Sequence, residues 1–183
     1  MNFSQRISVG VLSAAVTIAA LAGCGNSSSA SSPTPTVVGG ASSASGVSGP
    51  TVTTNGVTVS GPKEVQPTVT VTKGEPAPKT LVKKDVYTGG GTEIKAGGAG
   101  TFQYTGVLFS DGSLFDSSWN RDEPISFSLN QVIPGWREGI PGMKEGGRRL
   151  LIVPPNLAYG SQALPGIPAN STLVFVVDLI KVN

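Results

Sequence analysis

The sequence predicts an α+β domain in which an antiparallel sheet is accompanied by one short helix. Segments with strand-like alternation follow one another between turn signals, and the chain contains 25 glycines and 14 prolines. Only one segment, 133–143, suits a helix, and Pro141 limits it to about two turns. Ten of the aromatic residues lie between Tyr87 and Phe175, and the other one is Phe3. We therefore expect a single core in the C-terminal part of the chain.

The expected strands are 83–88, 101–108, 114–116, 125–129, 148–153 and 172–182. The segment 101–108 reads TFQYTGVL, which places Phe102, Tyr104 and Gly106 on one face. Asp111-Gly112 then supplies a reversal between strands. The last segment is long and rich in β-branched residues, which favours a central strand.

Composition excludes several classes of function. Thirteen basic and 11 acidic residues give a net charge of +2, so there is no electrostatic footprint for nucleic acid. The chain has no histidine and one cysteine, which excludes a Ser–His–Asp triad, a Cys–His pair, an internal disulfide and the usual metal ligands. The glycines at 89–91 lack a Gly-Lys-Ser/Thr sequel, so a phosphate loop is not expected.

The N-terminus has the features of an export signal. Arg6 precedes an uncharged run, 7–21, that is too short to span the ~30 Å hydrocarbon core of a membrane. The run ends in Leu-Ala-Gly-Cys24, which resembles the lipobox of bacterial lipoproteins. The resemblance implies that the signal 1–23 is removed, that Cys24 is lipidated, and that the protein is anchored outside the cytoplasm in the bacterial cell envelope. An ordinary secretory signal with a chance cysteine is the alternative.

A disordered tether is expected over 24–78. Residues 25–62 carry no charge and consist of Gly, Asn, Ser, Ala, Pro, Thr and Val only. Such a segment buries too little apolar surface to offset a backbone ordering cost of roughly 1–2 kcal/mol per residue. Val/Thr alternation around Asn55-Gly56 and in 67–72 is a weak strand signal, which leaves open an added edge strand. The folded domain is expected over 79–183.

Three motifs in the folded part carry a family resemblance. They are YTGVLFSDGSLFDSS at 104–118, VIPGWREGIPGM at 132–143 and LAYGSQALPGIPANSTLVFVVDLIKV at 157–182. In this order and spacing they resemble an FKBP-type peptidyl-prolyl cis-trans isomerase over residues 79–183. The resemblance implies the FKBP-like fold, a strongly twisted antiparallel sheet wrapped around one short helix. It also implies a reaction, rotation about the amide bond that precedes proline.

This reaction is compatible with the missing histidines. The rotation barrier is ~18 to 20 kcal/mol, and uncatalysed exchange takes tens to hundreds of seconds. An ordinary turnover of about 10 per second requires only roughly 3 to 5 kcal/mol of transition-state stabilisation. No covalent bond is made or broken, so we expect neither a cofactor nor a metal.

The resemblance assigns the apolar part of the site. Trp136 matches the tryptophan whose indole forms the floor under the prolyl ring. The residues that match its walls are Tyr104, Phe115, Val132, Ile133 and Phe175. For Phe175, ordinary core packing is an equally good interpretation.

The resemblance also assigns the polar part. The backbone N–H of Ile133 and the hydroxyl of Tyr159 match two donors to substrate carbonyls. Asp116 matches the carboxylate beside the pocket, and Arg121 would orient it through a charge-assisted hydrogen bond. Taken alone, Asp116 is also compatible with a turn-capping role. Ile167, in the loop before the last strand, would cover one side.

The expected partners are X-Pro segments of exported proteins, the membrane through the lipid anchor, and the macrolide inhibitors of the family. Affinity for macrolides is less secure, because Ile125 replaces a common aromatic wall residue and Leu164 replaces a common histidine. A monomer is expected. A binding module that captures Pro-containing segments without turnover would use the same residues. The pairs Lys83-Lys84 and Arg148-Arg149 are interpreted as solvated faces.

Overall fold

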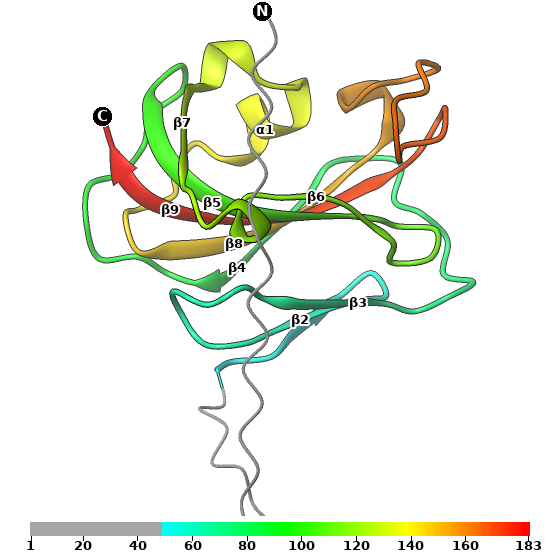
Figure 1. Cartoon of the computed structure of the whole chain (residues 1–183), viewed down its shortest axis with the longest axis horizontal. Helices are drawn as coiled ribbons and strands as arrows, with labels where there is room; N and C mark the ends of the chain where they lie inside the picture. The colour runs from blue at the N-terminus through cyan, green and yellow to red at the C-terminus, as the bar shows by residue number, and fades with distance from the viewer. Residues whose placement is uncertain (1–48) are drawn as a thin grey trace, which may run out of the picture. The chain divides into compact units, whose positions relative to one another are not determined.

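The computed structural model describes residues 49–183 (Figure 1). In this range the strands are β1 (Val52–Thr54), β2 (Val57–Ser60), β3 (Thr68–Val71), β4 (Val82–Tyr87), β5 (Ala99–Leu108), β6 (Leu114–Ser117), β7 (Ile125–Ser128), β8 (Gly147–Val153) and β9 (Leu173–Val182). The helices are α1 (Pro134–Gly139) and the short 3-10 turns η1 (Trp119–Arg121), η2 (Leu129–Gln131) and η3 (Pro155–Leu157). None of them has the length and apolar content that a membrane span needs. The signal 1–23 and Cys24 lie outside the described residues.

The main sheet is antiparallel, and its strand order is β4-β8-β9-β5-β6. All six strands expected from the sequence are confirmed, and the last one, β9, lies between β8 and β5 as a central strand. The other edge of β5 is shared, because β7 pairs with its first half and β6 with its second half. Residues Gln103 and Tyr104 lie between these two pairings.

The short helix α1 packs on β8. Two glycines one turn apart allow the close approach: a Cβ on Gly135 would lie 2.3 Å from Val153 Cγ1, and one on Gly139 would lie 2.7 Å from Leu151 Cδ2. Pro134 at the first helical position favours the start of the helix. The layer between α1 and the main sheet contains an aromatic and aliphatic core that includes Trp136 and Phe102.

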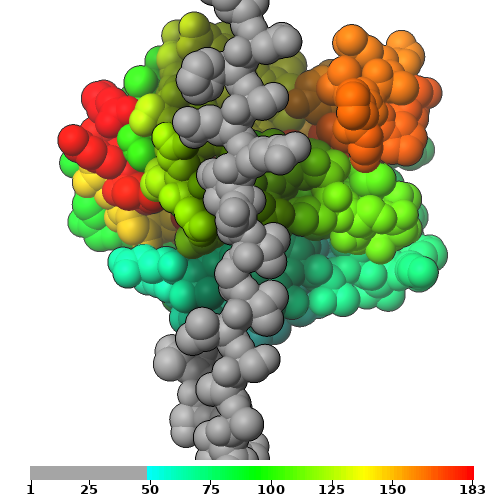
Figure 2. All heavy atoms as spheres, viewed as in Figure 1, coloured from blue at the N-terminus to red at the C-terminus, as the bar shows by residue number. Residues whose placement is uncertain are grey.

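The expected disorder of 24–78 is wrong for residues 52–71, which form a second antiparallel sheet in the order β1-β2-β3. Val57 and Val59 of β2 are completely buried. They pack on the face of the main sheet opposite α1, against an aliphatic cluster that includes Leu150, Ile152 and Val176. In Figure 2 the cyan and teal atoms of this N-terminal sheet adjoin the green atoms of the main sheet. The folded unit therefore begins well before residue 79.

Composition does not predict this sheet, because it reflects only the apolar area within the segment itself. The alternation of β2 directs Val57 and Val59 to one side, and the main sheet offers them an apolar face. Burial of both partners then contributes roughly 25 cal/mol per Å² of apolar surface removed from water. That gain offsets the ordering cost which the segment could not offset alone.

The interpretation of Arg148-Arg149 as a solvated face is also wrong. Arg148 is 1% exposed, and its Nε donates to Asp178 Oδ1 at 2.7 Å. Arg149 has an 11% exposed side chain, and its Nε donates to Asp85 Oδ1 at 2.6 Å. Burial raises the pKa of Asp178, and the hydrogen bond from Arg148 opposes that rise. Arg148 therefore belongs to the interior of the domain, and Arg149 is mostly covered by its hydrogen-bond partners.

Candidate active site

A cavity of about 380 Å³ opens between β5, β6, β7 and α1. Its lining is mostly aromatic and aliphatic, with one carboxylate and two phenol hydroxyls. The lining residues are Tyr104, Phe115, Asp116, Ile125, Phe127, Gln131, Val132, Ile133, Trp136, Tyr159 and Phe175. A largely apolar cavity with a few converging polar groups is the usual form of a small binding site.

The indole of Trp136 is the centre of the apolar part. It is 5% exposed and meets the rings of Tyr104 and Phe175 edge to face, with centroids 5.4 Å and 5.2 Å away. Phe127 lies 5.3 Å from it in a tilted arrangement. Such aromatic pairs stabilise a fixed ring position beyond their buried area. The indole is therefore held rigidly at the bottom of the cavity.

The walls come from strands that are distant in sequence. Phe115 on β6 and Phe175 on β9 meet edge to face at 5.5 Å, across β5. Val132 and Ile133 precede α1 and pack partly buried against the same core. The cavity wall thus depends on the tertiary arrangement of β6, β9 and the start of α1.

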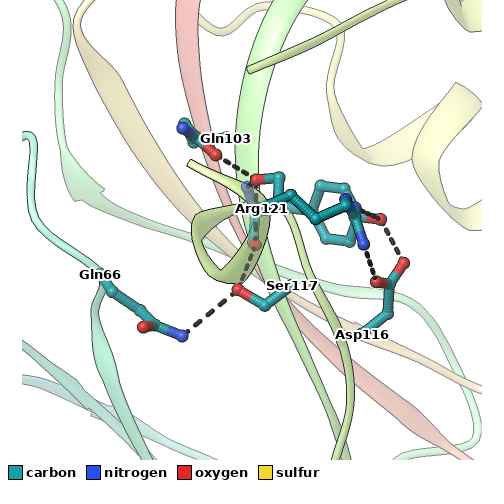
Figure 3. Close-up of polar contacts among 7 residues, drawn as sticks. Gln66, Gln103, Asp116, Ser117 and Arg121 are labelled. Carbon is teal, nitrogen blue, oxygen red and sulfur yellow. Dashed lines mark hydrogen bonds and ion pairs between the residues drawn. The ribbon is translucent and has the colours of Figure 1, made fainter. Parts of the chain in front are cut away.

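The carboxylate of Asp116 is fixed at the rim by two donors. Arg121 Nη1 donates to Asp116 Oδ1 at 2.7 Å, and the Tyr104 hydroxyl donates to Oδ2 (Figure 3). Arg121 Nη2 also donates to the Tyr104 oxygen at 3.1 Å, so the three side chains form a closed ring. The expected contact between Arg121 and Asp116 is present. The tyrosine hydroxyl in this ring was not predicted.

The charge of Asp116 follows from these contacts. Partial burial by itself raises the pKa of Asp116, but the hydrogen bonds from Tyr104 and Arg121 outweigh it and lower the pKa below the ordinary value. Burial, together with the bond to Asp116, raises the pKa of Tyr104 to about 12. Asp116 is therefore ionised and Tyr104 is protonated at neutral pH.

Two further donors belong to Tyr159 and Ile133, which both line the cavity. The Tyr159 hydroxyl lines the cavity; burial raises its pKa, and the charge of Asp116 adds to the rise, so it stays protonated. Ile133 is the N-cap residue of α1, and a helix leaves its first amides without an acceptor inside the helix. Both groups can donate to a bound carbonyl oxygen.

The structure places most of the predicted site residues around this one cavity. Arg121 is not a lining residue, but it donates a hydrogen bond to Asp116, which is one. Ile167 is not among the residues that line the cavity; it is 7% exposed and packs in the core cluster that also contains Trp136. Phe127 and Gln131 were missed, although the alternation of β7 places Phe127 on the same face as Ile125. Among residues 49–183, no cluster of three or more His, Cys, Asp or Glu side chains could hold a metal ion.

The part of the chain that forms this cavity matches a known protein family. The family model of FKBP-type peptidyl-prolyl cis-trans isomerases matches residues 90–180. The match covers β5 to β8 and most of β9, and it therefore contains every residue that lines the cavity. The N-terminal sheet lies outside it.

Individual relatives agree. The probable FK506-binding protein of Corynebacterium glutamicum is 49% identical over 106 residues, which are 58% of this chain and 90% of that protein. The FKBP-type peptidyl-prolyl cis-trans isomerase FkpA of Escherichia coli K12 is 48% identical over 103 residues, and the match spans 38% of its length.

Solved structures agree in fold as well. The crystal structure of FkpA from Escherichia coli superposes with a TM-score of 0.53 at 48% identity, over 56% of this chain and 48% of that chain. The crystal structure of AtFKBP13 gives a TM-score of 0.53 at 36% identity, over 58% of this chain and 96% of that chain. The aromatic cavity, the antiparallel sheet around α1 and these similarities lead to one conclusion: the chain belongs to the family of FKBP-type peptidyl-prolyl cis-trans isomerases.

Proposed function

We propose that this chain accelerates cis-trans rotation about X-Pro bonds in the cavity above Trp136. The observation that carries the proposal is an aromatic cavity with an ionised carboxylate, Asp116, fixed at its rim by Tyr104 and Arg121. A proline ring is apolar and flat enough to rest on an indole. The preceding amide then lies near the rim, where the polar groups are.

The cavity favours the twisted amide over the planar one. Rotation breaks the C–N resonance, so the twisted amide is less polar than the planar amide and loses less when water is excluded. Its carbonyl carbon becomes more electron-poor, and the negative charge of Asp116 stabilises that carbon. Binding energy that is larger in the twisted state than in the planar state lowers the barrier directly.

The remaining groups bind and orient. We propose that Trp136 forms the floor and that the walls bind the ring; these wall residues are Tyr104, Phe115, Val132, Ile133 and Phe175. The Ile133 amide and the Tyr159 hydroxyl donate to substrate carbonyls on either side of the rotating bond. None of these steps moves a proton or requires a bound cofactor.

Replacing Asp116 by alanine is the experiment that tests the proposal. We expect kcat/KM for an X-Pro peptide to fall about ten- to a hundredfold, the rate equivalent of one interaction with a charged group. Asp116→Asn is the matched control that keeps the shape and removes the charge, and it should lose nearly as much. Unchanged turnover in Asp116→Asn would refute the electrostatic role.

The pH dependence gives the same test a second readout. The folded-state pKa of Asp116 is lowered, so its carboxylate keeps its charge to a lower pH than an ordinary aspartate, whose pKa is 3.8. The wild-type rate should therefore stay level from about pH 8 to about pH 5 and decline only in stronger acid. Asp116→Asn should show no acid limb.

The site of action is a second part of the proposal. We propose that lipidated Cys24 anchors the chain outside the cytoplasm of a bacterium, where the isomerase acts as a monomer on X-Pro segments of exported proteins. The support is the Leu-Ala-Gly-Cys24 motif after an apolar run and the bacterial origin of relatives such as FkpA of Escherichia coli. The Corynebacterium glutamicum relative, a probable FK506-binding protein, supports macrolide binding in the same cavity.

Cys24→Ala tests the anchor. In a bacterial host we expect the wild-type protein in the membrane fraction, labelled by a fatty acid analogue, and the variant in the soluble or secreted fraction without label. The isomerase activity per molecule should be equal in both, because Cys24 lies far outside residues 90–180. A variant that still sediments with membranes would remove the basis for the anchor.

A further inference from the structure

The loop that connects β2 and β3 is fixed to the main sheet by the buried Arg148 and the half-buried Tyr87. Arg148 Nη1 donates to the carbonyl of Pro62 at 3.1 Å, and Nη2 donates to that of Val65 at 2.7 Å. The Tyr87 hydroxyl donates to the carbonyl of Gly61 at 2.9 Å. Arg148 is itself held by Asp178. Three carbonyls of one short loop are thus bound by donors on β4 and β8, which gives the loop one defined position.

This loop presents Gln66 to the active-site strand β6. Gln66 Nε2 donates to Ser117 Oγ at 3.2 Å. Successive side chains of a strand point to opposite faces, so Asp116 faces the cavity while Ser117 faces the N-terminal sheet. Figure 3 shows this arrangement, with Gln66 and Asp116 on opposite sides of the Ser117 position. Ser117 is 2% exposed, so its hydroxyl is enclosed by these partners.

The contact continues from Ser117 into the polar ring of the active site. Ser117 Oγ donates to the carbonyl of Tyr104 at 3.3 Å, and the amide of Ser118 donates to the same carbonyl at 3.1 Å. The amide of Tyr104 donates to Ser118 Oγ at 2.8 Å, and that hydroxyl donates to Gln103. Tyr104 then binds Asp116 through its own hydroxyl. Hydrogen bonds therefore connect Gln66 through Ser117 to the backbone of Tyr104, and the side chain of the same tyrosine connects it to the Asp116 carboxylate.

The strand that carries Asp116 needs such support. β6 ends the strand order of the main sheet, so only β5 holds it through backbone hydrogen bonds. The pairing register shifts between Gly106 and Val107, directly beside the position where Gly106 faces Asp116. A bulge interrupts the ladder locally and leaves the strand less constrained there. Side-chain contacts at Ser117 therefore matter more than they would in a central strand.

We propose that Gln66 is a positioning residue for the isomerase site, which acts through Ser117 to hold Asp116 and Tyr104 in their mutual orientation; the inference rests on the proposed function. Gln66 lies outside residues 90–180, so this support is contributed by the N-terminal sheet and not by the part of the chain that the family model matches. The N-terminal sheet is thereby a functional part of the isomerase domain.

The test is a double-mutant cycle on the full chain in detergent, with Gln66→Ala, Ser117→Ala and the double variant. We expect Gln66→Ala to lower kcat about two- to tenfold with KM unchanged, the rate equivalent of one net hydrogen bond. The double variant should be no slower than Ser117→Ala, because Gln66 acts only through Ser117. Gln66 is exposed, so the variant is expected to keep its folded structure.

The matched control is Thr53→Ala, which breaks the 2.9 Å hydrogen bond between the Thr53 and Thr58 hydroxyls within the same sheet and leaves the path to Asp116 intact. It should keep the wild-type kcat. Wild-type kcat in Gln66→Ala, equal losses in Thr53→Ala, or additive losses in the double variant would each overturn the proposal.

A second readout does not depend on turnover. Carboxyl-carbon NMR titration should find the pKa of Asp116 closer to its ordinary value in Gln66→Ala than in the wild type, because weaker bonds from Tyr104 and Arg121 lower it less. If the wild type does not accelerate X-Pro rotation, the proposed function fails, and this titration still decides the role of Gln66. An identical Asp116 titration in both proteins would overturn the positioning role.

Discussion

Trp136→Ala is expected to abolish measurable isomerisation and to lower the free energy of unfolding by about 3–5 kcal/mol. The indole is 5% exposed and touches the rings of Tyr104, Phe127 and Phe175. Its removal leaves a void under the cavity and takes away a packing partner of these three rings. Urea unfolding measures the stability, and X-Pro peptide kinetics measure the activity.

Trp136→Phe is the matched control, since it keeps an aromatic ring at the floor and removes only part of the volume. We expect it to recover most of the stability and part of the activity. If Trp136→Ala retained wild-type peptide binding, the substrate ring would not rest on this indole, and the assignment of the floor would be wrong.

The double variant Val57→Ala/Val59→Ala is expected to lower the free energy of unfolding by about 4 kcal/mol. Both valines are completely buried against the aliphatic face of the main sheet, and each truncation removes two carbon atoms and leaves a small cavity. A domain of this size is stable by only about 5–15 kcal/mol, so the loss is large. Thermal and urea unfolding of the full chain measure it.

Thr68→Ala/Thr70→Ala is the control for that variant. These two residues are exposed on β3 of the same sheet, so their combined effect should stay within about 1 kcal/mol. If the valine variant unfolded like the control, the N-terminal sheet would not belong to the cooperative unit of the isomerase domain.

The strands of the main sheet could be predicted because their signals are local. The alternation in β5 and the β-branched run of β9 follow directly from which residues face the core. The short length of α1, which lies within the predicted segment 133–143, likewise followed from Pro141. Each of these signals can be interpreted without knowledge of the rest of the chain.

The N-terminal sheet and Arg148 could not be predicted in this way, because their burial depends on partners distant in sequence. Val57 is buried against the aliphatic face that β8 and β9 form. Arg148 can be buried because Asp178 and the loop carbonyls accept its hydrogen bonds. Composition treats an uncharged Thr/Val segment as disordered and an arginine pair as solvated. Both interpretations are wrong, because the main sheet buries the valines and provides hydrogen-bond partners for Arg148.

The residues of the candidate site were predicted mainly from the resemblance of the three motifs to a family. The chemistry of the single residues predicted their roles only in part. Asp116 and Arg121 were expected to meet, and they do. Tyr104 was predicted only as a wall residue, because a phenol can provide either an apolar surface or a hydrogen-bond donor. In the structure its hydroxyl completes the ring with Asp116 and Arg121. Its role depends on the β5–β6 pairing, which places it beside Asp116.

Isomerisation in the cavity above Trp136 is tested most directly by the rate of cis-trans exchange in a short X-Pro peptide, measured with the full chain and with FK506 as competitor. We expect an exchange rate well above the uncatalysed one, which returns to background when the macrolide fills the cavity above Trp136. A peptide that binds in that cavity and still exchanges at the uncatalysed rate would contradict it, and the chain would then be a binding module for proline-containing segments.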